Sequence, residues 1–235
     1  MEIVISLSKQ CFVFVALIAL ISLIGCTIQQ TTTTTTARER ERVRETTTTT
    51  NQGTQQSNKD TYLQFEDRFF EIEQSALNAI DDLANVLDRL ANRNATIDEA
   101  ISSAERVRQE SQIASNDYNN LTVPSSLPSN VQGILEQATS SASSSYSELA
   151  LAMDALIAFL QAPAGSSEES RARQEFQNRL NSAVGLRNAA IDSLNSARRS
   201  LGLPKLSTGK ANMKFLSMHK LIAELSQLQK SMRKK

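Results

Sequence analysis

The sequence predicts an all-α protein whose folded part is an up-down-up-down four-helix bundle over residues 60–204. Three observations predict the bundle. Apolar residues recur at alternating intervals of three and four over four long segments. Residues that start or break helices fall between these segments. No window alternates with the period of two that is typical of a strand.

Each segment carries one apolar stripe that should face the core. The first is Tyr62, Phe65, Phe69, Ile72, Ala76, Ala79, Leu83, Val86 and Leu90. The second is Ala100, Ala104, Val107, Ser111, Ala114, Tyr118 and Leu121. The third is Val131, Leu135, Ala138, Ala142, Ser145, Leu149, Ala152, Leu156 and Phe159. The fourth is Phe176, Leu180, Ala183, Leu186, Ala190, Leu194, Ala197 and Leu201. Its alternation slips around Arg187.

Helix boundaries agree with these stripes. A capping box, in which a Ser or Thr is followed three residues later by Glu or Gln, satisfies free N–H groups at a helix start. Four such pairs precede the stripes: Thr61/Gln64, Thr96/Glu99, Ser129/Gln132 and Ser166/Glu169. Because the loops between the stripes are short, neighbouring helices should be antiparallel. Tyr62 should then lie at the same end as Tyr118 and Leu201, and Phe159 at the other.

Residues 1–25 are predicted to be a signal peptide. Lys9 precedes an apolar run over residues 11–21, as in export signals. The segment ends in Leu23-Ile24-Gly25-Cys26, which resembles the lipobox of prokaryotic lipoproteins. The resemblance implies cleavage before Cys26 and attachment of lipid to its sulfur, which would hold the protein on the extracytoplasmic face of the cell membrane. The alternative is an uncleaved anchor, because residues 11–28 are just long enough to cross a bilayer.

Residues 26–59 are predicted to be a disordered stalk between the lipid and the bundle. Thirteen of the 33 residues from Thr27 to Lys59 are Thr, and residues 38–45 alternate in charge. Ile28 and Val43 are the only aliphatic residues larger than Ala, so the segment cannot bury a core. Either an O-glycosylated stalk or a plain disordered spacer fits this composition.

Composition argues against most catalytic chemistry. His219 is the only His. Of the two cysteines, Cys26 is the expected lipid attachment site and Cys11 leaves with the signal peptide, so no cofactor or metal site is expected. The carboxylates of the first helix are expected on solvated faces, away from the seam where burial would shift a pKa. They are Glu66, Asp67, Glu71, Glu73, Asp81 and Asp82. The 25 basic residues balance 25 acidic ones, so no nucleic-acid partner is expected either.

Two sequons occur at predicted interhelix turns. Asn94-Ala95-Thr96 and Asn120-Leu121-Thr122 are possible glycosylation sites in an exported protein. The tripeptide is also common by chance, so Asn94 and Asn120 remain candidates only.

Residues 205–235 are predicted to form a basic amphipathic helix. They contain eight basic residues and one acidic residue, Glu224. Their apolar stripe is Phe215, Met218, Leu221, Leu225, Leu228 and Met232. Two partners fit this pattern: anionic lipid headgroups, or the bundle itself through Glu66, Asp67, Glu71 and Glu73.

The sequence therefore predicts a non-enzymatic surface lipoprotein that presents a helical bundle for binding or envelope interaction. Its partners would be the membrane, through acylated Cys26, and other envelope proteins. The alternative function is an extracytoplasmic ligand-sensing or solute-binding module. A polar cavity near Ser111 and Ser145 would favour the alternative, whereas a closed core would favour the first reading.

Overall fold

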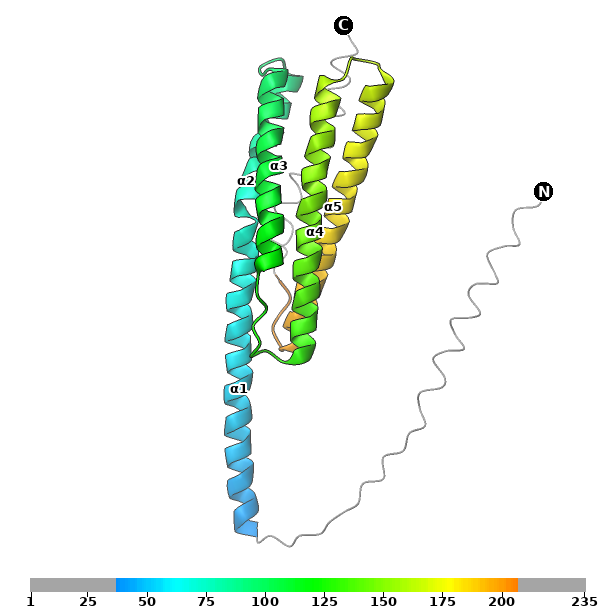
Figure 1. The fold of residues 1–235 in the computed structure, drawn as a ribbon. Coiled ribbons are helices and arrows are strands. Elements are labelled where there is room, and N and C mark those ends of the chain that lie inside the picture. Colours follow the sequence, from blue (N-terminus) through cyan, green and yellow to red (C-terminus); the bar gives the residue numbers. More distant parts are fainter. Residues whose placement is uncertain (1–36, 207–235) are drawn as a thin grey trace, which may run out of the picture. The chain divides into compact units, whose positions relative to one another are not determined.

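The computed structural model describes residues 37–206, so the predicted signal peptide, Cys26 and nearly all of the predicted C-terminal helix lie outside the described residues. The described part is all-helical, as predicted (Figure 1). Its helices are α1 (Ala37–Ile72), α2 (Gln74–Ala91), α3 (Ile97–Asn120), α4 (Ser129–Gln161) and α5 (Ser167–Ser200). Over this same range, no helix has the length and hydrophobicity of a membrane span.

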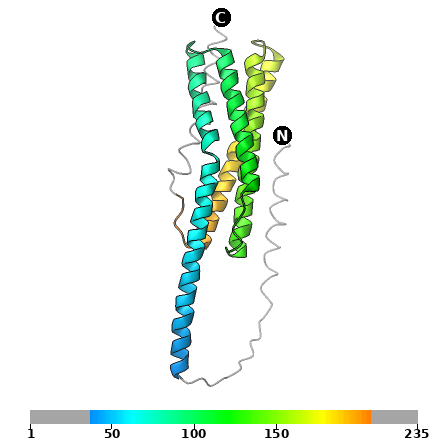
Figure 2. The same ribbon diagram turned by 60° about the vertical axis from the view of Figure 1, so that its left-hand side comes forward.

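The chain divides into two units, residues 1–48 and 49–235. In the second unit α2 packs against α3, α3 against α4, and α4 against α5, and both ribbon views place these pairs side by side (Figures 1 and 2). The α1 residues of this unit reach α5, where the Tyr62 hydroxyl donates to the Leu194 carbonyl at 3.2 Å. Four helical layers thus surround one core.

The core follows the predicted stripes of α3, α4 and α5 closely. It follows the first stripe less well, because Ile72, Val86 and Leu90 are only half-buried, whereas α2 buries residues off the stripe, namely Leu77, Ile80, Ala84 and Leu87. Every residue of the third stripe, on α4, is buried. The fourth stripe differs at one position, because Leu186 is only half-buried while Arg187 is buried. With Arg187 included, the buried positions of α5 run 183, 187, 190 and 194, which restores the alternation of four and three. The slip in the sequence pattern therefore marks a charged residue that occupies a core position.

The start of the first helix differs from the prediction. We expected a disordered stalk up to Lys59 and a cap at Thr61, but α1 is helical from Ala37 and Thr61 lies inside it. Extending an existing helix costs far less than nucleating a new one, and no proline interrupts residues 37–72. The composition of residues 37–59 alone did not predict that the helix would extend through them.

The Ser or Thr half of two of the four predicted capping boxes is confirmed. Thr96 and Ser166 are the N-caps of α3 and α5, and each side-chain oxygen accepts from the N–H of the Glu three residues later. The prediction for Ser129 is wrong, because Pro128 is the N-cap of α4 and no side chain caps it. Gln132 instead donates to the Ser125 and Leu127 carbonyls of the preceding loop.

Candidate functional site

The candidate site is centred on a break between α1 and α2. The sequence predicted one continuous helix here, but α1 ends at Ile72 and α2 begins at Gln74. At the break the Phe69 carbonyl accepts a hydrogen bond from the Tyr118 hydroxyl at 2.8 Å, and the Phe70 carbonyl accepts one from the Gln74 side chain at 3.2 Å. Side chains that bind helix carbonyls interrupt the regular ladder, which accounts for the break.

Glu73, the residue at the break, forms a buried ion pair with α5. Arg187 Nη2 lies 2.5 Å from Glu73 Oε1, and both side chains are buried. Burial opposes the charge of Arg187 and is the largest single influence, but Glu73, Tyr146 and Tyr118 together outweigh it and hold the pKa of the guanidinium above its ordinary value. The other terminal nitrogen of Arg187, Nη1, has no hydrogen-bond partner among the described residues.

Two tyrosines complete the polar contacts of the Glu73 carboxylate. Tyr146 from α4 donates to Glu73 Oε2 at 2.8 Å, and the Tyr118 hydroxyl from α3 lies 3.4 Å from the same oxygen. Burial raises the pKa of both phenols well above the usual value, and the negative charge of Glu73 raises it further. Both tyrosines therefore stay neutral. Tyr146 donates its proton to the carboxylate, whereas the single hydroxyl proton of Tyr118 is directed mainly to the nearer Phe69 carbonyl.

Aromatic rings enclose this ionic centre. The Tyr118 and Tyr146 rings stack with centroids 5.8 Å apart, and the Phe69 ring lies 4.7 Å from that of Tyr118. The Arg187 guanidinium carbon lies 5.9 Å from the Phe69 ring centroid and 5.8 Å from that of Phe70, within the range of a cation–π interaction. The charges are thus shielded from water and partly compensated by ring faces.

The centre joins all four helical layers through one polar side chain each: Glu73 at the α1–α2 break, Tyr118 on α3, Tyr146 on α4 and Arg187 on α5. We call these four residues the ionic core. Both carboxylate oxygens of Glu73 already accept hydrogen bonds, and both phenols are held neutral. Chemically, this arrangement suits the positioning of helices better than proton transfer to a substrate.

A second buried ion pair lies seven residues earlier on α1. Arg198 Nη1 on α5 contacts both Glu66 oxygens, at 2.6 and 2.7 Å, and the Tyr62 hydroxyl donates to Glu66 Oε2 at 2.8 Å. Burial, followed by the charge of Glu66, raises the pKa of Tyr62. Arg198 also donates through Nε to the Pro204 carbonyl at 2.5 Å, which fixes the chain after α5 to this layer.

These pairs correct the expectation that no carboxylates lie in the core. Glu66 and Glu73 were expected on solvated faces, yet both are buried. Neither is available for the tail contact that the sequence suggested, because each already binds an arginine of α5. The signal in the sequence was the slip at Arg187, together with two glutamates that are seven residues apart and so share one helix face.

Serines between the helices are mostly hydrogen-bonded within the core. Ser115 on α3 and Ser143 on α4 each donate to the other's carbonyl at 3.0 Å, and Ser145 donates to the Ala183 carbonyl on α5 at 2.7 Å. Ser111 is fully buried, and its hydroxyl has no partner among the described residues. The predicted cavity position at Ser145 is thus occupied by a helix-to-helix hydrogen bond.

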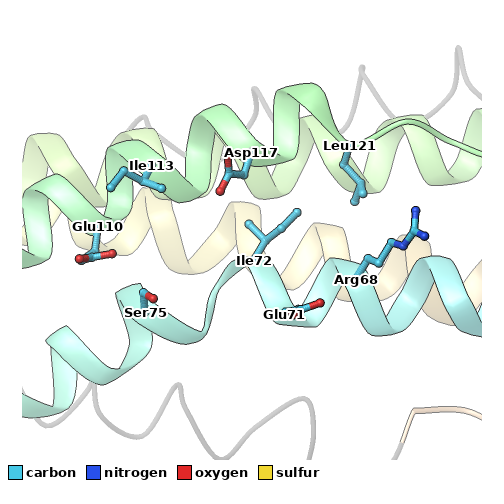
Figure 3. Close-up of a pocket in the computed structure, with 8 residues that line it drawn as sticks. All are labelled: Arg68, Glu71, Ile72, Ser75, Glu110, Ile113, Asp117 and Leu121. Carbon is cyan, nitrogen blue, oxygen red and sulfur yellow. The ribbon is translucent and has the colours of Figure 1, made fainter.

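A surface groove runs between the α1–α2 break and α3 (Figure 3). Its volume is about 340 Å³, and its lining is Arg68, Glu71, Ile72, Ser75, Glu110, Ile113, Asp117 and Leu121. Figure 3 shows Asp117 and Leu121 extending from the α3 side toward α1, with Ile72 extending toward them. The groove therefore combines apolar side chains from both walls with three carboxylates and one arginine.

Both sequon asparagines are exposed in the structure. Asn94 lies in the turn before α3, and Asn120 is the last residue of α3. The Thr96 hydroxyl of the first sequon is already engaged as the N-cap of α3. The other predicted site residue, Cys26, lies outside the described residues, as does His219.

Comparison with known proteins gives no match: no family model, curated protein or solved structure is similar to the chain.

Proposed function

We propose that the chain is a non-enzymatic lipoprotein, anchored through acylated Cys26, that presents its helical bundle on the extracytoplasmic face of the cell membrane for binding or envelope interaction. The observation that carries the proposal is Leu23-Ile24-Gly25-Cys26 at the end of an apolar run. Lipid attachment at a cysteine gives durable anchoring when more than one acyl chain is added.

The interior of the bundle supports a presenting role. The buried charges neutralise one another as Glu73 with Arg187 and Glu66 with Arg198, and no polar group of the ionic core is left to bind a substrate except Arg187 Nη1. A ligand-sensing module is the second candidate, and the unpartnered hydroxyl of Ser111 favours it. The hydrogen bond from Ser145 to α5 weighs against it.

An up-down-up-down order of the helices, continued by a C-terminal amphipathic helix, is part of the proposal. Paired side chains support the order, because residue numbers rise on one helix as they fall on the next. The pairs are Phe69–Tyr118, Asp82–Arg106 and Arg89–Glu99, then Ser115–Ser143 and Arg108–Asp154, then Ser145–Ala183 and Glu148–Arg179. Glu66–Arg198 and Glu73–Arg187 extend the same trend to α1 and α5.

Metabolic labelling with a palmitate analogue in a bacterial host, followed by mass spectrometry, tests the anchor. The full-length protein and the Cys11→Ser variant should both carry lipid on Cys26, start at that residue and fractionate with the membrane. Cys26→Ser should lose the label. Cys11 is the matched control, because it lies in the apolar run rather than at the cleavage motif. An intact Met1 start, or labelling that survives Cys26→Ser, contradicts the proposal.

A further inference from the structure

The groove beside the α1–α2 break has the chemistry of a site for a basic amphipathic helix. Its carboxylates Glu71, Glu110 and Asp117 form no ion pair among the described residues, and Ile113 is 46% exposed. With Arg68 counted, the groove lining is still net negative, and exposed apolar surface rimmed by polar residues is typical of a helix-binding groove. The occupant should present an apolar stripe flanked by lysine or arginine.

The chain carries such a segment after the last described residue. Residues 207–235 contain seven basic residues and one acidic residue. Phe215, Met218, Leu221, Leu225, Leu228 and Met232 recur at helical spacing within it. Its charge is opposite to that of the groove, and its stripe supplies the apolar face that the groove requires.

The described part of the chain delivers this segment to the right end of the bundle. Arg198 binds both the Pro204 carbonyl and Glu66, and the Leu206 N–H donates to the Asn195 side chain at 3.0 Å. Glu66 lies two residues from Arg68, the first groove residue on α1. As a helix, 29 residues span about 43 Å, whereas residues 68–75 of the groove wall span only about 10 Å. The segment is therefore long enough to cover the groove.

We propose that residues 207–235 dock into this groove as a helix, with the lysines beside Glu71, Glu110 and Asp117. A tethered segment binds at high effective concentration, so a modest groove suffices. The proposal does not depend on the lipid anchor.

Limited digestion with a protease that cleaves after lysine tests docking, because residues 60–204 contain no lysine. Cleavage therefore reports on the tail, at Lys210, Lys214, Lys220 and Lys230, with Lys59 as an internal reference. In the full chain, purified in a neutral detergent, tail cleavage should be slow. Ile113→Glu should accelerate it about tenfold, which corresponds to about 1.4 kcal/mol of docking free energy.

Leu151→Glu is the matched control. Leu151 is 42% exposed, close to Ile113, but lies on α4 away from the groove. Leu151→Glu should leave tail cleavage unchanged, and helix content should be the same in both variants. Glu110→Arg combined with Asp117→Arg adds no lysine to the bundle and should accelerate tail cleavage as Ile113→Glu does, by charge alone.

Three outcomes overturn the proposal. Equal tail cleavage in all variants means that the groove does not hold the tail. Protection that appears only with phosphatidylserine vesicles, and is insensitive to the groove variants, assigns the tail to the membrane surface. Protection that rises with protein concentration means that the tail docks on a second copy.

Discussion

Ion pairs in two parts of the bundle are built differently. Around α2 they lie on the surface: the Arg106 and Asp82 side chains are 59% and 57% exposed. Around the last part of α1, from Tyr62 onward, the ion pairs lie in the core: the side chains of Arg187 and Glu73 are 6% and 3% exposed. We call these two parts the α2 section and the α1 section. The same residue chemistry therefore has two different roles within one domain.

The difference concerns specificity as well as stability. In the α2 section the core consists of aliphatic layers such as Leu83 and Leu87, which similar layers could replace after a shift of the helices. In the α1 section each of the four helical layers must present one particular polar group at one height. A shifted helix would leave a buried charge unpaired, which costs several kcal/mol. We hypothesise that the α1 section fixes the register of the bundle, and the following predictions test this.

The largest effect should come from high pH. All three tyrosines of the chain, Tyr62, Tyr118 and Tyr146, lie in the α1 section, and their pKa values are raised in the folded state. Above about pH 10 the unfolded chain releases phenol protons that the folded chain retains, so stability falls as pH rises. Each tyrosine contributes about 1.4 kcal/mol per pH unit, or about 4 kcal/mol for three.

Parallel titrations of tyrosinate absorbance and helical circular dichroism check this. The two signals should change together, because the phenols ionise only when the bundle unfolds. If one tyrosine ionises near its ordinary pKa while the helices remain intact, the buried hydrogen bonds to Glu66 and Glu73 do not exist as described.

Breaking the ionic core from one side should be the next largest effect. Arg187→Leu or Glu73→Leu alone leaves an uncompensated buried charge, so each should lower the free energy of unfolding by about 3–5 kcal/mol. The double variant removes both charges and should recover most of that loss or exceed the stability of the parent. Urea unfolding of the parent and the three variants gives the coupling energy. Additive losses would contradict the pairing.

The double variant also separates register from stability. If the α1 section fixes the register, Glu73→Leu with Arg187→Leu should be stable but less uniquely folded. Amide NMR spectra should then show line broadening or additional peaks. A spectrum as sharp as that of the parent would show that the apolar layers alone define the register.

Conservative substitutions should lower the stability less in the α2 section than in the α1 section, by a smaller margin than the effects above. Leu83→Met nearly preserves volume in the α2 section and should cost less than about 1.5 kcal/mol. Glu73→Gln is just as conservative in volume, yet it leaves Arg187 without its counter-charge and should cost about 3 kcal/mol. Thermal unfolding of both variants measures the difference. Equal costs would mean that the charge on Glu73 is dispensable.

The two sections depart from the sequence pattern in different ways. In the α2 section Leu83 lies on the predicted stripe, but Leu87 is buried off it, while Val86 and Leu90 of the stripe are only half-buried, so the helix buries a face shifted from the predicted one. Glu73 and Arg187 occupy core positions because each finds a partner on another helix. A pattern that scores residues singly assigns both to solvent, and the sequence marks the pair only through the slip at Arg187 and the seven-residue spacing of Glu66 and Glu73.

The break at Glu73 could not be predicted from the sequence either, because it too depends on a contact with another helix. Ile72, Glu73 and Gln74 contain no proline or glycine, and the apolar stripe continues across them. The break depends on the Tyr118 hydroxyl, which lies 45 residues from Glu73 in the sequence and binds the Phe69 carbonyl. The groove could not be predicted either, since its walls meet at this break.

The smallest expected effect is the loss of a surface ion pair in the α2 section. Arg106 Nη1 lies 3.0 Å from Asp82 Oδ2, which is within ion-pair distance although longer than in the buried pairs, but solvent screens both charges and both side chains regain freedom when the pair is broken. Arg106→Ala should therefore lower the free energy of unfolding by less than about 1 kcal/mol, and less still in high salt. Urea unfolding at low and high ionic strength measures this, with Arg187→Leu as the buried counterpart whose cost salt should barely change. A salt-insensitive loss of several kcal/mol at Arg106 would mean that short ion-pair distance, rather than burial, determines what a charge contributes, and the distinction between the two sections would disappear.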